Sequence, residues 1–179
     1  MQLFTNDTID IPALPKYEVV ELYKPHSNYW KIIVINLLIF LGIIGIGAIV
    51  LTLTLVEYRA EAKFIIGIYS ALTLILFLFF RLSFKNRGYA FRAHDVMCKS
   101  GIIVESTTIV PLNRIQHIEL NQGVFSRMYQ LGTLQIFTAG GQTGHIRISG
   151  IPIDEAKSLR DMILKKLDLT ENQITKNAE

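Results

Sequence analysis

The chain has 179 residues, enough for one or two domains; 50% of them are hydrophobic and only 18% are charged. Soluble domains carry about 25% charged residues. The deficit here is confined to residues 32–56 and 64–80, which contain no Asp, Glu, Lys or Arg. The net charge of +3 is too small to indicate nucleic-acid binding, and a single cysteine, Cys98, excludes an intrachain disulfide and a cysteine-based metal site.

Residues 1–31 precede the first uncharged run, and we expect them to form a cytoplasmic or interfacial segment. The apolar side chains between residues 19 and 23 fit either a short amphipathic turn at the membrane surface or a partly ordered tail. Trp30 and Lys31 end the segment, and both residue types favour the boundary between lipid and water.

The run 32–56 would be about 37 Å long as a helix, enough to cross a hydrocarbon core about 30 Å thick. A signal peptide is the competing interpretation, but its apolar core would be shorter and closer to the start of the chain. The run 64–80 would reach about 25 Å, and a buried helix of a soluble core is its alternative. Only residues 57–63 separate the two runs, which favours a second helix that crosses back. We therefore predict a transmembrane hairpin within residues 32–84.

Small side chains let membrane helices approach closely, and both runs contain them. On the second run, Gly67 and Ala71 are spaced four residues apart. On the first run the small residues are Gly42, Gly45, Gly47 and Ala48. The pattern indicates either where the two helices meet or a contact with another subunit.

Basic residues gather outside the predicted hairpin. Seven flank its outer ends: Lys16, Lys24, Lys31, Arg81, Lys85, Arg87 and Arg92. The loop has two, Arg59 and Lys63, which two glutamates balance. Because positively charged flanks stay in the cytoplasm, we expect both termini, and the domain that follows the hairpin, to be cytoplasmic.

From residue 88 the apolar residues follow the period of two that is typical of strands. A turn at 99–101 separates two apolar stretches, as in a hairpin. The stretches 134–138 and 146–148 repeat the pattern, with a turn at Gly140, Gly141 and Gly144 between them. That glycine-rich turn lacks the phosphate-loop pattern and precedes a strand, so we do not expect it to bind phosphate. Six or seven short antiparallel strands are predicted.

The spacing then becomes helical, and one apolar stripe results, formed by Ala156, Leu159, Ile163 and Leu167. The acidic residues 154–155 fall in the first turn and the lysines 165–166 in the last, as the helix dipole prefers. Such a helix can close the open end of a small curved sheet. We expect a domain over residues 88–168 and a tail over 169–179.

Short motifs mark the domain: Gly101-Ile102-Ile103, Pro111-Leu112-Asn113-Arg114-Ile115-Gln116, Gln122-Gly123, Arg127, and Leu134 through Gly140. With the two preceding apolar runs, and with Leu14-Pro15 and Tyr17, they resemble the bacterial pleckstrin-homology-like (PH-like), membrane-flanked domain family. Its short members carry two transmembrane helices and one PH-like domain. The resemblance covers most of residues 12–168. One departure is Gln130, where a glycine is expected before the next strand; Gly132 is the alternative for that role.

The expected fold class is therefore a membrane α-hairpin followed by an α+β domain, an antiparallel PH-like split β-barrel capped by a C-terminal α-helix. The resemblance implies a bacterial, multi-pass plasma-membrane protein that works with a membrane protein partner, a longer relative carrying several PH-like domains. It implies no agreed biochemical activity, and we expect no cofactor.

Two residues near the middle of the domain, Arg114 and Gln116, are candidate interaction residues. Ile115 breaks the parity of Ile118, so either a bulge lies near 116–117 or Ile115 faces outward. Arg114 and Gln116 then fall near the barrel mouth. We favour a structural arginine that bonds loop carbonyls over an arginine that contacts a ligand.

Arg127 is the third candidate interaction residue, although we favour the interpretation that its side chain is a solvated surface charge. Four apolar neighbours are expected to pack inward: Val124, Phe125, Met128 and Leu131. The four histidines stand singly, without metal-ligand or catalytic spacing, so we predict no metal site and no enzyme.

Two functions remain. The first is a non-enzymatic interaction or scaffolding subunit of a membrane complex. The second is recognition of anionic lipid headgroups by the juxtamembrane residues Arg81, Lys85, Arg87 and Arg92, at about 1 kcal/mol each. Topology alone explains those four residues, and the domain's loops lack a dense basic cluster. The sequence therefore favours partner binding.

Overall fold

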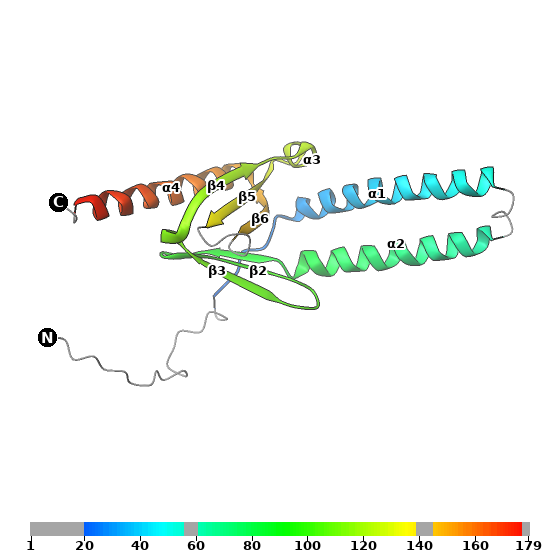
Figure 1. Cartoon of the computed structure of the whole chain (residues 1–179), viewed down its shortest axis with the longest axis horizontal. Helices are drawn as coiled ribbons and strands as arrows, with labels where there is room; N and C mark the ends of the chain where they lie inside the picture. Colours follow the sequence, from blue (N-terminus) through cyan, green and yellow to red (C-terminus); the bar gives the residue numbers. More distant parts are fainter. Residues whose placement is uncertain (1–19, 56–60, 139–144, 177–179) are drawn as a thin grey trace, which may run out of the picture.

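The structure is a computed structural model that describes residues 20–55, 61–138 and 145–176, with side chains described up to residue 167. Two long helices, α1 (Ser27–Thr54) and α2 (Ala62–Lys85), run side by side away from a smaller mixed domain (Figure 1). Both are long and apolar enough to cross a membrane. They would reach about 42 and 36 Å. The two predicted apolar helices are confirmed, with α1 beginning before residue 32 and α2 continuing past residue 80.

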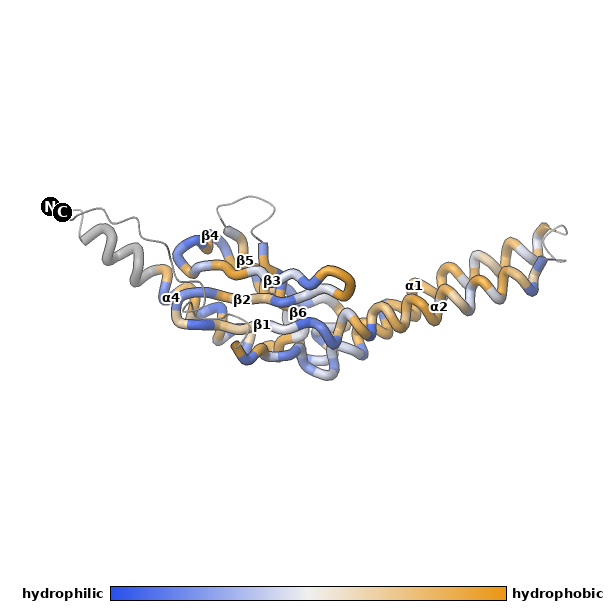
Figure 2. Tube along the Cα trace, turned by 90° about the horizontal axis from the view of Figure 1, so that it is seen from below, coloured by the Kyte–Doolittle hydropathy of each residue, from blue (hydrophilic) through white to orange (hydrophobic). Residues whose placement is uncertain are grey.

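The outer surface of the hairpin is apolar and uncovered. Only 17% of the most apolar window of α1, and none of that of α2, is buried. Figure 2 shows the hydrophobic colour continuing along both helices. Soluble proteins rarely expose an apolar surface of this extent, whereas a bilayer would solvate it.

A side-chain contact joins the two helices within their apolar runs. The hydroxyl of Tyr69 on α2 donates a hydrogen bond of 3.0 Å to the backbone carbonyl of Leu41 on α1. A Cβ placed on Gly45 would lie 3.1 Å from that hydroxyl, so a small residue is needed there. A Cβ on Gly67 would meet nothing within 4 Å. Of these two glycines, Gly45 marks the contact between the helices and Gly67 does not.

The first sheet follows α2 directly and has the order β1-β2-β3. Its strands are β1 (Gly88–Phe91), β2 (Asp95–Ser100) and β3 (Ser106–Pro111). The predicted hairpin is confirmed, but β2 continues through Ser100, so the turn begins at Gly101 and not at residue 99. Gly101 has φ +124°, a conformation that favours glycine. Tyr23 forms an isolated antiparallel bridge with Tyr89 of β1. The chain at Tyr23 is thus held against the sheet in extended form, not in an amphipathic turn.

The second sheet has the order β4-β5-β6 and is entered through a short 3-10 turn, η4 (Leu112–Arg114). Its strands are β4 (Ile115–Asn121), β5 (Leu131–Thr138) and β6 (Ile146–Pro152), with the short helix α3 (Val124–Met128) between β4 and β5. A register shift between Ile115 and His117 confirms the bulge, and it lets Ile115 point into the core. The predicted turn at residues 140–144 lies outside the described residues.

Gln130 stands where the family resemblance leads us to expect a glycine, and its backbone conformation shows how the turn forms without one. It has φ +54°, in the left-handed region that favours glycine, so this glutamine takes the turn role itself. Gly132 serves a different purpose: a Cβ there would lie 3.0 Å from the Leu120 side chain and 3.3 Å from that of Ile153. Glycine at 132 lets β5 approach the start of the last helix.

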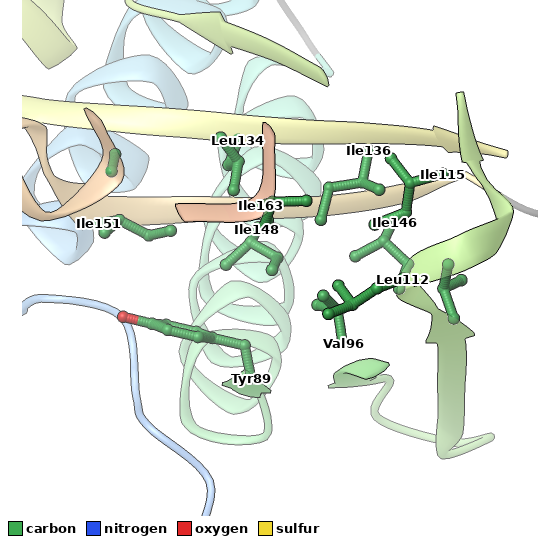
Figure 3. Close-up of a cluster of buried hydrophobic side chains, with 12 residues drawn as sticks. Tyr89, Val96, Leu112, Ile115, Leu134, Ile136, Ile146, Ile148, Ile151 and Ile163 are labelled. Atoms are coloured by element: carbon green, nitrogen blue, oxygen red, sulfur yellow. The ribbon is translucent and has the colours of Figure 1, made fainter. Parts of the chain in front are cut away.

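That last helix, α4 (Ile153–Lys176), lies against the second sheet. Ala156 and Ile163 of the predicted stripe are fully buried, and Leu159 and Leu167 pack against the same core. Figure 3 shows Ile163 meeting Leu134, Ile136 and Ile148. The helix continues past the predicted boundary at residue 168, so the lysines at 165–166 lie within it and not in its last turn.

The domain is PH-like in its α+β composition, with two antiparallel three-stranded sheets and a C-terminal helix. Core side chains from both sheets, including Val96 and Ile148, belong to one cluster. Among the described residues the ladders of the two sheets do not join, so the structure does not close the predicted split barrel.

Candidate anion-binding pocket

A cavity of about 450 Å³ lies where the two membrane helices join the domain. Its walls come from the segment that leads into α1 and the start of that helix, the link between α2 and β1, β1 itself, the end of β2, and β6. The lining residues are Pro25, Tyr29, Arg87, Gly88, Tyr89, Cys98, Lys99, Ser100, Arg147, Ile148 and Ser149.

Two glycines allow this junction to form. A Cβ on Gly88 would lie 2.9 Å from the Cβ of Leu22, so the segment before α1 fits against β1 only where a side chain is missing. Gly150 has φ +83°, and its backbone carbonyl accepts a hydrogen bond of 2.8 Å from the backbone N–H of His26. The chain entering α1 is thereby fixed to both sheets.

Three cationic side chains line the cavity, and no carboxylate does. Arg87 is oriented by weak hydrogen bonds of 3.4 Å to the hydroxyls of Tyr29 and Ser83. Its guanidinium lies 6.0 Å from the centre of the Tyr29 ring. These contacts leave its charge without a carboxylate partner among the described residues.

The other two cations come from strands. Lys99 forms an ion pair of 2.7 Å with Glu105, whose side chain is 57% exposed and lies outside the cavity lining. Arg147 stands between the buried Ile146 and Ile148 on β6, so strand alternation turns its side chain to the outer face. Arg147 is exposed and has no ion pair or side-chain hydrogen bond with the described residues. The cavity is therefore an electropositive site suited to an anion.

Two titratable groups on the inner wall, Cys98 and Tyr89, carry no negative charge near pH 7. Burial raises the pKa of the Cys98 thiol, and the positive charge of Arg87 opposes that increase. Burial, together with Glu155 and Tyr23, raises the pKa of Tyr89 to about 12. Both groups stay protonated and neutral near pH 7, so neither offsets the positive charge of the cavity.

Of the four predicted juxtamembrane lipid contacts, one lines the cavity: Arg87. Arg81 stacks on the Trp30 ring, with its guanidinium carbon 4.9 Å from the ring centre. Lys85 is exposed in the last turn of α2. Arg92 lies at the other end of β1, where it makes hydrogen bonds of 2.5 and 2.6 Å to the carboxylate of Asp95. The hydrogen bonds to Asp95 raise the pKa of Arg92 above the ordinary value for arginine. The charge of Arg92 is therefore paired with a neighbouring carboxylate, and Arg92 does not line the cavity.

The three predicted interaction residues, Arg114, Gln116 and Arg127, are exposed and lie outside the cavity. Arg114 ends η4, before β4, and Arg127 lies in α3, after β4, so the strand separates them in the chain. Arg114 makes no hydrogen bond with a described residue, so the expected tie to loop carbonyls is not seen. The roles of these three residues in an interaction stay predictions.

The expectation that four apolar residues around α3 pack inward is half wrong. Leu131 is buried and Phe125 is half-buried. Val124 and Met128 are 76% and 72% exposed. Helix α3 has only five residues, too few for an inward stripe, and two of its apolar side chains face away from the domain.

The sequence alone does not predict that Lys99 and Arg147 line one cavity, because they are far apart in the chain. The one sequence signal for Arg147 is its position between two inward-facing isoleucines. That position indicates that its side chain points outward, but it does not indicate which residues lie opposite. Within the described parts of the chain, no group of three His, Cys, Asp or Glu residues is placed to hold a metal ion.

Comparison with known proteins gives the family. A family model described as "Bacterial PH domain" matches residues 31–167, more than half of the chain. The chain is 32% identical over 99 residues to UPF0699 transmembrane protein YdbS of Bacillus subtilis (strain 168), covering 55% of this chain and 60% of that protein. It is 26% identical over 115 residues to UPF0699 transmembrane protein YdbT of the same organism, covering 61% of this chain and 23% of that protein.

The matches span less than two thirds of either relative. No solved structure matches the chain significantly. Two apolar helices, a PH-like α+β domain and the family match over residues 31–167 agree with one another. The chain belongs to the bacterial PH domain family, among relatives that are transmembrane proteins.

Proposed function

We propose that this protein is a non-enzymatic, membrane-anchored PH-like module that binds the phosphate of anionic lipid headgroups in the cavity at the base of its hairpin. One observation carries the proposal: Arg87, Lys99 and Arg147 surround a cavity of about 450 Å³ that no carboxylate lines. Guanidinium groups bind phosphate through paired, charge-assisted hydrogen bonds.

The position of the cavity favours a lipid as the source of that phosphate. Trp30, three residues into α1, and Arg81, near the end of α2, stack on each other. Trp and basic residues are enriched at the membrane–water boundary. Arg87 follows Arg81 by six residues, so the cavity opens near the level at which headgroups lie.

We further propose that the protein lies in the plasma membrane with both termini in the cytoplasm. The seven basic residues at the outer ends of the helices, against two in the loop, support this orientation. It would place the cavity on the side of the bilayer where anionic lipids attract basic segments, with about 1 kcal/mol for each Lys or Arg near the surface.

A second candidate function is assembly with a membrane protein partner, and a groove between α1 and α2 favours it. The groove has a volume of about 400 Å³, and Gly42, Gly45 and Ala48 lie in its lining. Small residues admit the close approach of another helix. A longer relative with several PH-like domains is the partner that we propose to test, by co-purification from native membranes in mild detergent.

Native mass spectrometry of the full chain in mild detergent tests headgroup binding. The protein would be incubated with equal amounts of phosphatidylglycerol and phosphatidylcholine. We expect retained phosphatidylglycerol to dominate, and Arg147→Gln to weaken its retention by about five-fold, the equivalent of about 1 kcal/mol.

Arg160→Gln is the matched control. Arg160 lies on α4, pairs with Asp161 at 2.8 Å, and is outside the cavity lining. The Arg160→Gln substitution removes the same charge from the chain but none from the cavity, so lipid retention should stay unchanged. Equal retention of the two lipids, or an equal loss in both variants, would refute the proposed site.

A further inference from the structure

Two turns of the domain present large apolar side chains to solvent. The β2–β3 turn carries Ile103 and Val104, which are 90% and 76% exposed. Helix α3 carries Val124 and Met128, which are 76% and 72% exposed. Single exposed apolar residues are ordinary on protein surfaces, but these four residues form two pairs, one in the β2–β3 turn and one on helix α3.

Both turns lie at the end of the domain from which the membrane helices depart. Figure 1 places the β2–β3 turn beside the domain end of α2, and α3 beside the start of α1. Figure 2 shows the β2–β3 turn as a hydrophobic tip that extends toward the hairpin. The ammonium group of Lys31 on α1 lies 5.8 Å from the centre of the Tyr129 ring, directly after α3.

The fold holds each pair outward. In the β2–β3 turn, a Cβ on Gly101 would overlap the carbonyl oxygen of Val104, so the turn is tightly closed. The ion pair between Lys99 and Glu105 fixes its base. At α3, the side-chain amide of Gln122 donates a hydrogen bond of 2.9 Å to the carbonyl of Leu131, which ties the two ends of the loop together.

The level of the membrane surface follows from the start of α1. The Trp30 ring packs against Phe77 and Phe84 of α2, with centres 5.6 and 5.8 Å apart, and Arg81 covers it. Aromatic and basic residues in this arrangement favour the boundary between headgroups and acyl chains. Lys31 follows Trp30 directly and reaches Tyr129, so α3 lies close to that boundary.

We propose that the tip formed by Ile103 and Val104, and the face formed by Val124 and Met128, insert into the bilayer that the hairpin spans. Lipid is the occupant because both surfaces lie at the end of the domain from which α1 and α2 depart, near the level that Trp30 and Arg81 mark. Insertion would remove four large apolar side chains from water. It would also hold the domain at two points, one beside each helix, and set its orientation on the membrane.

This docking does not depend on headgroup binding, and its test separates the two. The full chain carrying Cys98→Ser would be labelled with an environment-sensitive fluorophore through Ile103→Cys or Val124→Cys. It would be reconstituted in phosphatidylcholine vesicles, which supply no anionic headgroup. Lys165→Cys is the matched control, because Lys165 is exposed on α4, which runs away from the hairpin (Figure 1).

Each label would be quenched in turn by iodide in the water and by phosphatidylcholine with brominated acyl chains. We expect the labels at 103 and 124 to be quenched by the brominated lipid and to be several-fold less accessible to iodide than the label at 165. Iodide access equal to that at 165, at either position, would overturn the two-point docking. Protection from both quenchers would also overturn it, because a second copy of the chain and not lipid would then cover the surface.

Discussion

Gly150 of β6 lies directly against the ring of Tyr29 at the start of α1. A Cβ built on Gly150 would be 2.7 Å from Cγ of Tyr29, closer than real Cβ atoms approach. Tyr29 in turn accepts the weak hydrogen bond from Arg87. The contact between a glycine and a tyrosine therefore joins the hairpin to the domain and positions one wall of the cavity.

Replacement of Gly150 should loosen this junction. Gly150→Ala adds a Cβ at φ +83°, which costs about 1–3 kcal/mol in backbone strain, and it forces Tyr29 to move. We expect a lower thermal unfolding temperature in detergent and weaker retention of phosphatidylglycerol. Gly123→Ala is the control, since a Cβ there meets nothing within 4 Å and its φ is −74°. Equal stability of the two variants would contradict the claim that the contact between Gly150 and Tyr29 holds the hairpin against the domain.

The stripe of α4 should be a main source of the domain's stability. Ile163 is fully buried, so Ile163→Ala should lower the free energy of unfolding by about 2–5 kcal/mol. The next residue provides the control, because Leu164 is 42% exposed and Leu164→Ala should change stability by less than about 0.5 kcal/mol. Thermal unfolding of the full chain in detergent measures both. An unchanged transition in Ile163→Ala would mean that α4 is not part of the core.

The raised pKa of Tyr89 makes stability depend on pH in the alkaline range. Its ordinary value is 10.0 and its value in the folded chain is about 12, so the folded state holds the proton more tightly than the unfolded state. The stabilisation is complete below pH 10 and is lost as the pH rises to about 12. Tyr89→Phe should remove that part of the alkaline loss of stability. Denaturant titrations of both proteins across this range measure the difference, and identical pH profiles would count against the burial of the phenol.

The proposed orientation makes the loop between the helices accessible from outside the cell. In a Cys98→Ser background, Thr54→Cys should react with a membrane-impermeant thiol reagent in intact cells. Lys165→Cys should react only after the membrane is opened. The reverse pattern would invert the topology. Native Cys98 is a poor probe, because it is half-buried and burial raises the pKa of its thiol.

Sequence periodicity predicted the elements well where each has one consistent apolar face. The alternation of Leu134, Ile136 and Thr138 and the stripe of α4 both face the core as expected. The ends of elements were harder to predict, because α2 continues through Arg81 to Lys85 by extending helical hydrogen bonds past the last apolar run. Polar residues at a helix end carry little signal about where the helix stops.

The candidate site could not be predicted in the same way, because it depends on contacts between distant segments. Arg87, Lys99 and Arg147 stand singly in the sequence, and no loop holds a dense basic cluster. Only the pairing of the strands, and the fit of the α1 start against Gly150, bring the three charges around one cavity. That is why the sequence favours partner binding, whereas the arrangement of the three charges led us to propose headgroup binding.

Photo-crosslinking of a phosphatidylglycerol analogue with a reactive headgroup, in vesicles that contain the full chain, tests the central claim most directly. Peptide mass spectrometry would locate the crosslinks. We expect them at Tyr29, at Lys99–Ser100 and at Arg147–Ser149, to be displaced by phosphatidylglycerol but not by phosphatidylcholine, and to be reduced in Arg147→Gln. Crosslinks confined to Arg81 and Lys85 and unchanged in Arg147→Gln would show that lipid meets only the outer flanks of the helices and that the cavity is not a headgroup site.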